Sequence, residues 1–295
     1  MKKFPTCYLA PISEYTHRAY RELCKKRGAE FTFAPLINTT QIIHQKDKNI
    51  HRFIDFEKEK KVGIQLFGSR PEEYPRAIER INTFEKIKWL DVNAGCPMPK
   101  ITKIGAGSRL LTNQDTLIEI LKSIQGFDFT KSVKIRLLKN SESTKKLVEK
   151  LSPLVDVIII HGRTPEQRYS GTANWDIIKE INETTDNFII GNGDIQTIAQ
   201  GKKYIKEKYC DGFMIGREAM KNPWLFSKKD ANPKKIFFEY YKFYKKYKIS
   251  NPNDLKQKAI QFFHSFRGAK ELRSTIGNMF SEEEIVGYIK DHDFK

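Results

Sequence analysis

Cysteine is scarce in this sequence, and its four copies lie far apart. Cys7, Cys24, Cys96 and Cys210 form no C-x-x-C pair, and no nearby histidine completes a set of metal ligands. Because a structural zinc site needs four such ligands at short spacing, we expect no metal. Sparse, unpaired cysteine is typical of a reducing compartment, which indicates a cytoplasmic protein.

Long apolar stretches are also missing. No run approaches the roughly 20 residues that span a bilayer, and the N-terminal "MKKFPTCYLAP" lacks the apolar stretch of a signal peptide. We therefore expect a soluble protein with no membrane association. The glycine pairs at 105–107 and 191–193 lack the third glycine of a dinucleotide-binding fingerprint, so a Rossmann domain is not supported. Nothing in the sequence specifies an oligomer, and a monomer is favoured.

Acidic residues are few relative to basic ones. Lysine and arginine number 53 against 36 acidic residues, which gives a formal net charge of +17. Such a field suits a polyanionic partner, nucleic acid first of all, although a generally lysine-rich surface would give the same composition. The excess is concentrated near the C-terminus, where residues 231–274 hold 11 lysines and arginines against three acidic residues.

Eight short apolar runs alternate with segments of helical periodicity. The runs occupy residues 6–11, 30–36, 61–67, 87–93, 132–137, 155–161, 187–192 and 210–216. This alternation predicts a (β/α)8 TIM barrel better than an open sheet. After residue 230 the pattern changes to aromatic, lysine-rich helices. We therefore expect a catalytic barrel over residues 1–230 and a small helical domain over residues 231–295.

Polar and glycine residues follow several of these strands, at the end where TIM barrels carry their active sites. "GNGDI" (191–195) and "GFMIGREAMKNPW" (212–224) close the last two strands. Glycine lets backbone N–H groups approach an anion, and loops seven and eight commonly bind phosphate in this fold. Gly193, Asp194, Gly216 and Arg217 are therefore the predicted phosphate group, with ordinary tight turns as the alternative.

Three further side chains are candidates for chemistry. Lys134 lies mid-strand, facing either a ligand's negative charge or solvent at a strand end. His161 ends an apolar run and is either a ligand contact or a packed histidine. Cys96 sits in a Gly-Cys-Pro turn after a strand. It is either a small buried hydrophobe or a proton donor, since no base adjoins it to make a nucleophile.

The stretch around Cys96, "DVNAGCPMPKITKIGAGSRLL" (91–111), resembles the signature of the tRNA-dihydrouridine synthases. Members of that family are FMN-dependent enzymes on a TIM barrel with a helical tRNA-binding domain. The resemblance extends through "QLFGSRPEEYPRAI", "VKIRL", "IIIHGRTPEQRYSGTANWDII", "GNGDI" and "GFMIGREAMKNPWLF". These motifs stand in the family's order over most of residues 5–226, a far more specific match than any one alone.

The resemblance implies roles for individual residues. Cys96 matches the proton donor, and Asn93 a contact to both flavin and substrate. The other implied flavin contacts are Ala10, Pro11, Ile12, Gln65, Lys134 and His161, with Asn192, Gly193, Asp194, Gly216 and Arg217 at the phosphate. Lys100, Arg163 and Arg168 match positions that approach RNA. Independently, the basic C-terminal segment predicts RNA contacts from Lys256, Lys258, Arg267, Lys270 and Arg273.

The implied reaction reduces a uracil ring in tRNA. NADPH or NADH reduces FMN, a hydride passes to C6, and Cys96 delivers a proton to C5, while Lys134 stabilises the anionic reduced flavin. The target nucleotide must first flip out of the RNA. Two alternatives remain: a flavin barrel oxidoreductase acting on a free pyrimidine, and a catalytically inactive tRNA-binding barrel.

The match departs from the family pattern at two places. His17 and Tyr20 stand in "EYTHRAYR" where the family usually has other residues, and residues 33–40 read "FAPLINTT" in place of an acidic motif. We expect both departures to affect the barrel mouth and the choice of uridine. The tRNA position and the preferred nicotinamide are not specified by the sequence.

Overall fold

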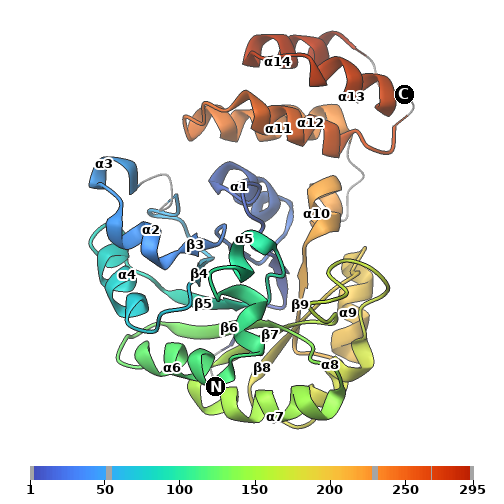
Figure 1. Ribbon diagram of the computed structural model, residues 1–295. Helices are drawn as coiled ribbons and strands as arrows, with labels where there is room; N and C mark the ends of the chain where they lie inside the picture. The colour runs from blue at the N-terminus through green and yellow to red at the C-terminus, as the bar shows by residue number, and fades with distance from the viewer. Residues whose placement is uncertain (1–2, 51–54, 228–231, 267, 293–295) are drawn as a thin grey trace.

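The computed structural model describes residues 3–50, 55–227, 232–266 and 268–292. Its centre is a closed barrel of eight parallel strands, because β2, at one end of the sheet, also pairs with β4 near the other end (Figure 1). A two-residue strand, β3 (Ile37–Asn38), extends β4 at its end. The barrel strands are β1 (Cys7–Leu9), β2 (Phe31–Phe33), β4 (Val62–Phe67), β5 (Trp89–Ala94), β6 (Thr130–Arg136), β7 (Val157–His161), β8 (Phe188–Asn192) and β9 (Gly212–Ile215). Each of the eight predicted runs overlaps one of them, with β5 ending one residue later and β6 beginning two residues earlier than predicted, so the predicted barrel is confirmed.

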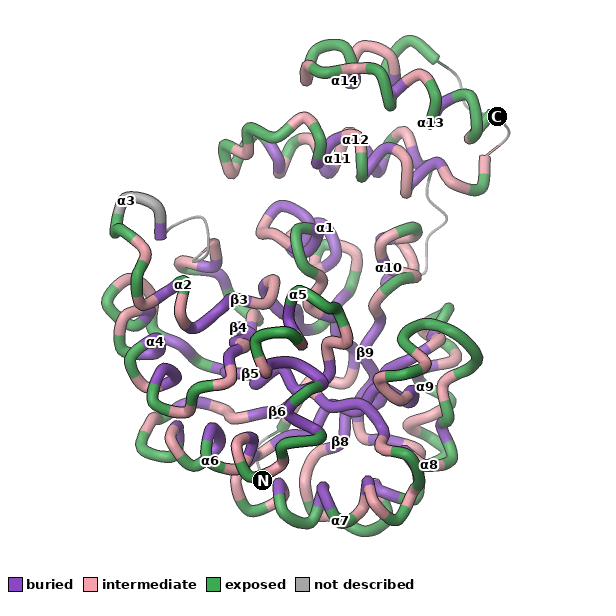
Figure 2. Tube along the Cα trace, viewed as in Figure 1, coloured by how far each residue is buried: buried purple, intermediate pink, exposed green. Residues whose placement is uncertain are grey.

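Strand side chains alternate between the barrel interior and the surrounding helices. In β5, Leu90, Val92 and Ala94 pack outward, whereas Trp89 belongs to a separate cluster inside the barrel. That inner cluster fills the N-terminal half of the barrel with apolar side chains; it consists of Tyr8, Ala10, Phe31, Phe33, Trp89, Val157, Ile159, Ile190 and Met214. Figure 2 shows the strands as the buried centre of the molecule. The next inward positions along β5 are Asp91 and Asn93, so the interior turns polar towards the mouth.

Helices cover the barrel, and side-chain caps fix where several of them begin. Asn140, Asn174 and Thr197 each accept a hydrogen bond from the backbone of the first helical turn, as good N-cap residues do. The barrel helices are α1 (Arg18–Arg27), α2 (Thr39–His44), α3 (Asp47–Ile50), α4 (Glu73–Asn82), α5 (Pro99–Thr102), α6 (Gln114–Ser123), α7 (Ser141–Leu151), α8 (Trp175–Asn182), α9 (Ile198–Lys206) and α10 (Arg217–Lys221). Short 3-10 turns at Gly107–Leu111, Ser152–Leu154 and Pro223–Phe226 complete the connections.

Four C-terminal helices form a separate layer beside α1, with α13 and α14 outermost (Figure 1). They are α11 (Pro233–Lys246), α12 (Pro252–Phe262), α13 (Ala269–Gly277) and α14 (Glu282–Asp291). We refer to them as the C-terminal helical layer. The predicted boundary between residues 230 and 231 lies outside the described residues. Within the described ranges, no helix is both long and apolar enough to cross a membrane.

Candidate active site

A chain of hydrogen bonds runs up the barrel interior to the mouth. The Trp89 indole donates to the Ser132 hydroxyl (2.8 Å), which donates to one oxygen of Asp91 (2.6 Å). The Gln65 amide donates to the other Asp91 oxygen (2.6 Å) and accepts from the Asn93 amide (2.7 Å). Because the carboxylate can only accept when ionised, it fixes the orientation of both amides. Asn93 is thereby held with its carbonyl oxygen towards the backbone after β5.

That carbonyl oxygen builds the turn that carries Cys96. Asn93 Oδ1 accepts hydrogen bonds from the N–H groups of Gly95 (3.2 Å) and Cys96 (3.0 Å). From the other side, the Ser108 N–H donates to the Cys96 carbonyl (2.9 Å). Gly107 has a φ of 62°, and a Cβ there would lie 2.5 Å from the same carbonyl oxygen. The glycine-rich run behind Cys96 therefore closes tightly against its turn, and only glycine fits at residue 107.

The Cys96 thiol is half-buried at the mouth and remains protonated near neutral pH. Burial raises its pKa above the ordinary value, against smaller opposing effects of the Met98 backbone and of Arg136 and Lys134. A protonated thiol can give up a proton but is a poor nucleophile. The proton-donor interpretation thus has a physical basis, whereas the fully buried hydrophobe does not match the exposure of Cys96.

Lys134 points into the barrel and not to solvent at a strand end. It pairs in register with Asn93 of β5, and its Nζ donates to Asn192 Oδ1 (3.0 Å) on β8. The Asn192 amide is itself fixed by donation to the Met214 carbonyl (2.8 Å). Burial, with the neighbouring Arg136 charge, lowers the pKa of Lys134 to about 8. The ammonium group is therefore desolvated and has a neutral amide as its hydrogen-bond partner.

The predicted phosphate group gathers at the ends of β8 and β9. Gly193 and Asp194 both have positive φ, 127° and 53°, and form a sharp turn. Asp194 accepts from Arg163 (2.6 and 2.8 Å) and from Arg217 (3.0 Å). Since the carboxylate is directed at these guanidinium groups, Asp194 can serve an anion only through its backbone and by orienting Arg217. Gly216 lies beside Ala10, whose Cβ would be 3.6 Å from a Cβ at residue 216.

His161 is surrounded by positive charge. Burial is the largest cause that lowers the pKa of His161 far below its ordinary value. The neighbouring charges lower this pKa further, so the imidazole is neutral; they belong to Lys134, Arg136, Arg163 and Arg217. With Asp194 as the carboxylate paired to this cluster, the mouth has an excess of cations. An anionic ligand fits such a site, because it would neutralise charges that otherwise repel one another. Among the described residues, no group of His, Cys, Asp and Glu side chains is arranged to hold a metal ion.

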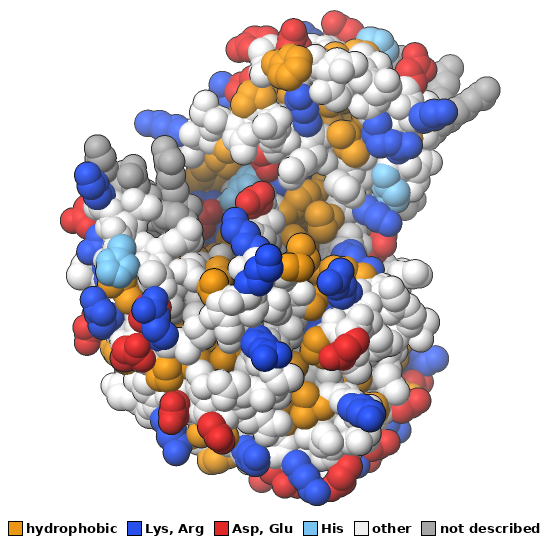
Figure 3. Space-filling view, in the orientation of Figure 1, with side chains coloured by type: hydrophobic (Ala, Val, Ile, Leu, Met, Phe, Trp, Pro, Cys, Tyr) orange, Lys and Arg blue, Asp and Glu red, His pale blue; other side chains and the backbone are white. Residues whose placement is uncertain are grey.

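Exposed apolar side chains gather around the same mouth. Met98, Ile104 and Tyr169 are each about half exposed (51, 49 and 51%), and all three lie in the loops that follow β5 and β7. Figure 3 shows hydrophobic and basic side chains mixed over α5, and a hollow where the barrel faces the C-terminal helical layer. The Tyr169 ring lies between the guanidinium groups of Arg217 (4.8 Å) and Arg136 (5.6 Å). Flat apolar groups among cations suit a ligand with bases and phosphates.

Sequence reasoning missed three residues of this site, namely Asp91, Arg136 and Tyr169. Asp91 orients the Gln65 and Asn93 amides, and burial raises its pKa to about 6. Arg136 donates to the carbonyl oxygens of Gly95 (2.9 Å) and Arg168 (2.7 Å), which ties the Cys96 turn to the loop containing Tyr169. A signal was available for two of them, because Asp91 and Arg136 are charged residues two positions from Asn93 and Lys134 on strands of period two.

The residues predicted to contact RNA are placed very differently from one another. Lys100, Arg168, Lys270 and Arg273 are exposed, and Lys256 is half-buried with its Nζ on the Gly277 carbonyl (3.1 Å). Arg267 lies outside the described residues.

Two of the side chains predicted to contact RNA are buried and bonded within the protein. Arg163 is 2% exposed, and its guanidinium is engaged by Asp194 and the Gly171 carbonyl (2.7 Å). Lys258 is 0% exposed, with its Nζ bound to Asp254 (2.9 Å) and to the Tyr15 carbonyl (3.1 Å). Neither side chain is available to a phosphate. Both hold protein segments together.

The departures at His17 and Tyr20 fall at the junction between α1 and the C-terminal helical layer. His17 Nε2 lies 2.9 Å from Asp254 and 3.0 Å from the Tyr240 hydroxyl. The Tyr20 hydroxyl donates to the Ala219 carbonyl, and its ring stacks on Phe262. These two residues therefore hold α1 against neighbouring helices, and they do not shape the barrel mouth as expected. Residues 33–40 hold Asn38, which caps α2.

Comparison with known proteins gives a consistent result. The family model described as Dihydrouridine synthase (Dus) matches residues 8–289. The chain is 34% identical over 223 residues to "Probable tRNA-dihydrouridine synthase" from Aquifex aeolicus (strain VF5), covering 74% of this chain and 70% of that protein. It is 28% identical over 289 residues to "tRNA-dihydrouridine synthase B" from Proteus vulgaris, covering 96% and 85%.

Among solved structures, the histamine dehydrogenase from Rhizobium sp. 4-9 matches with a TM-score of 0.56 at 11% identity, over 81% of this chain and 49% of that one. At that identity the likeness concerns the fold alone. The family match spans nearly the whole described chain and includes every element of the mouth. The chain belongs to the dihydrouridine synthase family.

Proposed function

We propose that this protein is a tRNA-dihydrouridine synthase that uses FMN and NADPH or NADH to reduce the C5=C6 bond of a uridine in tRNA. The observation that carries the proposal is the half-buried Cys96 thiol. It is kept protonated by burial and held by Asn93 in a turn beside Lys134. The family membership of the chain and the names of its relatives support the same activity.

The residues at the mouth fit an anionic flavin. Lys134 would lie against the electron-rich part of the ring, with Asn192 holding its ammonium in place. Gly193, Gly216 and Arg217 would hold the phosphate, since Asp194 orients Arg217 and no side chain crowds Gly216 closer than Ala10 at 3.6 Å. The bound flavin would supply a hydride to C6 of the uracil.

The chain's own residues would supply the proton. Hydride addition at C6 leaves negative charge on C5 and O4 of the ring, and the Cys96 S–H bond breaks to form the C–H bond at C5. Water then returns a proton to the thiolate. Lys134 and Arg136, which both favour the thiolate electrostatically, would lower the barrier to that transfer. Asn93 would orient the ring, because its own amide is fixed by Gln65.

The tRNA would reach the mouth with its target nucleotide flipped out. Unstacking costs a few kcal/mol, which contacts to the RNA backbone must offset. Lys100 and Arg168 at the mouth, and Lys256, Lys270 and Arg273 in the C-terminal helical layer, are the proposed contacts still accessible to RNA. Tyr169 offers an exposed ring beside the site.

The test compares Cys96→Ala with Cys210→Ala, a buried cysteine of the barrel. Purified proteins loaded with FMN are incubated with unmodified tRNA and NADPH, and dihydrouridine is mapped at each position. We expect wild type and Cys210→Ala to reduce a defined uridine, and Cys96→Ala to lose about 100-fold or more in single-turnover rate at equal flavin content. A full rate in Cys96→Ala removes the proton-donor role. Wild type that holds flavin but leaves tRNA unreduced contradicts the reaction itself.

A further inference from the structure

A basic groove lies between α1 and α11, away from the barrel mouth. It encloses about 580 Å³ and is lined by Lys26, Arg27, Asn232, Lys234, Lys235, Phe238, Glu239 and Lys242. Because α1 follows β1 and runs back antiparallel to it, Arg18 is at the mouth end of α1 and Arg27 at the far end. Nine residues of helix separate the two, about 14 Å. The groove is thus distinct from the site around Cys96.

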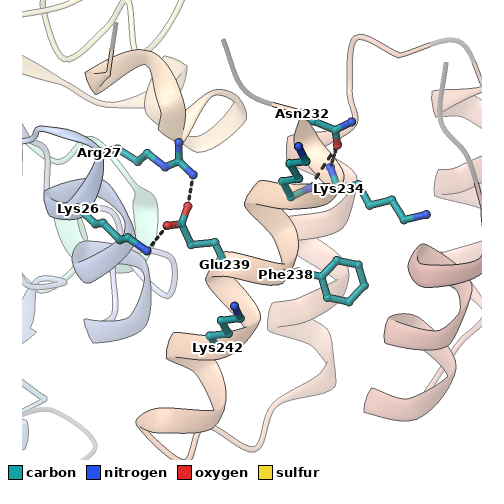
Figure 4. Close-up of a pocket in the computed structure, with 8 residues that line it drawn as sticks. Lys26, Arg27, Asn232, Lys234, Phe238, Glu239 and Lys242 are labelled. Atoms are coloured by element: carbon teal, nitrogen blue, oxygen red, sulfur yellow. Dashed lines mark hydrogen bonds and ion pairs between the residues drawn. The ribbon is translucent and has the colours of Figure 1, made fainter. Parts of the chain in front are cut away.

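The groove's acidic side chain is already paired with two cations. Glu239 of α11 lies 2.5 Å from Lys26 and also pairs with Arg27, both from the last turn of α1 (Figure 4). Burial would raise the pKa of Glu239, but the hydrogen bonds from Lys26 and Arg27 bring it below its ordinary value. The carboxylate therefore stays ionised and holds two cations in place at one wall of the groove.

On the opposite wall, two lysines of α11 have no such partner among the described residues. Lys235 and Lys242 are seven residues apart on α11, hence on one face and about 10 Å apart along the helix axis. Both are exposed, and neither ammonium group has a hydrogen bond or ion pair within the part of the chain that the structure describes. Lys234 also lines the groove, but its Nζ donates to the His292 carbonyl of the outer helices (3.0 Å). The other four cations share one carboxylate, and like charges so gathered favour the binding of an anion.

The size and lining of the groove select the kind of anion. Its volume is in the range of sites that hold organic ligands rather than single ions. Phe238 is its one apolar lining residue, which argues against an apolar ligand. Lysines spread along about 10 Å of helix suit a chain of phosphates better than one compact charge. An RNA backbone supplies such a chain, and a folded RNA engaged at the mouth extends well beyond it.

We propose that this groove binds phosphates of the tRNA backbone, at a contact remote from the nucleotide being reduced. The inference rests on the proposed function, because that function supplies the RNA. Lys26 and Arg27 belong to the barrel, whereas Lys235 and Lys242 belong to the C-terminal helical layer. A backbone segment in the groove therefore contacts both parts at once and helps set how the RNA lies relative to the mouth.

The experiment measures binding of unmodified tRNA to FMN-loaded protein by fluorescence anisotropy at several salt concentrations. The test variant is Lys235→Gln/Lys242→Gln, and the charge-preserving variant is Lys235→Arg/Lys242→Arg. The matched control, Lys122→Gln/Lys206→Gln, removes two exposed lysines from α6 and α9. Glutamine and arginine both keep high helix propensity, and melting temperatures verify that each variant is folded.

We expect the glutamine variant to bind tRNA about tenfold more weakly at 0.1 M salt, with the slope of log K against log[salt] smaller by about two. The arginine variant and the control should match wild type. The single-turnover rate at saturating tRNA should stay within about twofold, since neither lysine is near Cys96.

Equal affinity and equal salt slope in the glutamine variant and the control overturn the proposal. So does a rise in KM for NADPH with unchanged tRNA binding, which would assign the groove to the reductant. Failure of the proposed function is separable, because tRNA binding is measured without catalysis. If wild type binds tRNA without reducing it, the proposed function fails and the binding comparison still tests the groove. If wild type reduces tRNA but the groove variants bind tRNA as tightly as wild type, only the groove proposal fails.

Discussion

Two buried lysines, one at the barrel mouth and one under the C-terminal helical layer, have opposite surroundings. Lys134 keeps part of its side chain accessible, and its ammonium is bonded to the neutral amide of Asn192. Lys258 is fully buried and pairs with Asp254 at 2.9 Å, while its Nζ lies 3.3 Å from the centre of the Tyr15 ring. Burial lowers the pKa of both, but at Lys258 the Asp254 carboxylate opposes the shift.

The difference separates a charge that a bound anion would stabilise from a charge already paired within the protein. Asp254 would have a raised pKa from burial alone, yet Lys258 and hydrogen bonds from His17 and Tyr240 hold it well below its usual range. That cluster joins α1 to α11 and α12, so its charges are satisfied within the protein. At Lys134 the Asp91 carboxylate offsets the charge only in part, because burial and the Arg136 charge act more strongly, so a bound anion at this opening would stabilise the ammonium group.

The largest expected effect is on stability. Lys258→Met leaves Asp254 buried without its cation, and breaking a buried pair in this way costs about 3–5 kcal/mol. Lys134→Met removes a desolvated charge whose hydrogen-bond partner is a neutral amide, and Asp91, which Lys134 stabilises electrostatically, keeps its hydrogen bonds from Ser132 and Gln65. The free energy of unfolding of the flavin-free protein should therefore change by less than about 1 kcal/mol. Urea unfolding followed by circular dichroism measures both, with Lys256→Met as the control on α12. Equal losses of unfolding free energy in the variants at residues 134 and 258 would show that the two lysines do not differ in their role in stability.

The second prediction concerns alkaline pH. The folded flavin-free protein loses the Lys134 proton near pH 8, whereas the unfolded chain keeps it to about 10.5, so the unfolded state binds more protons between these values. The free energy of unfolding of wild type should therefore rise relative to that of Lys134→Met, by about 1.4 kcal/mol per pH unit at most. Urea unfolding of both proteins from pH 7 to 10.5 tests this. Parallel curves would mean that Lys134 titrates normally.

The smallest effect comes from making Lys134 resemble Lys258. Asn192→Asp gives Lys134 a carboxylate partner, which should raise its pKa and remove the alkaline rise in stability. The added negative charge should also weaken FMN binding about tenfold, or about 1.4 kcal/mol. Flavin fluorescence titration measures the affinity, and Asn182→Asp, at the C-terminal end of α8, controls for the change in net charge. Unchanged flavin affinity would show that Lys134 does not contact the cofactor.

Much of the barrel could be predicted because its signals are local. A run such as 155–161 is apolar on both faces, which is what a strand covered on both sides requires, and it forms β7 at Val157–His161. The strand ends predicted from the sequence placed Asn93 and His161 at the mouth, whereas the direction of Lys134 stayed open. Lys134 pairs with Asn93 in register, and His161 with Asn192, so residues distant in sequence meet there.

The failures share one cause. Lys258 and Lys256 are two residues apart on α12 and look alike in sequence, yet one is fully buried and the other bonds the Gly277 carbonyl near the surface. Which face of an amphipathic helix is covered depends on the element packed against it, and no local pattern contains that information. Arg163 likewise became buried because Asp194, 31 residues later, turns towards it.

The sequence by itself determined the barrel, the order of its strands and the position of Cys96 at a strand end, because backbone periodicity and turn chemistry are properties of neighbouring residues. Tertiary structure alone decided which charges face a ligand, which are sealed under α11 and α12, and that α1 and α11 enclose a basic groove. Those outcomes depend on burial and on charges brought together from distant segments. Burial and charge pairing are set only when the chain has folded.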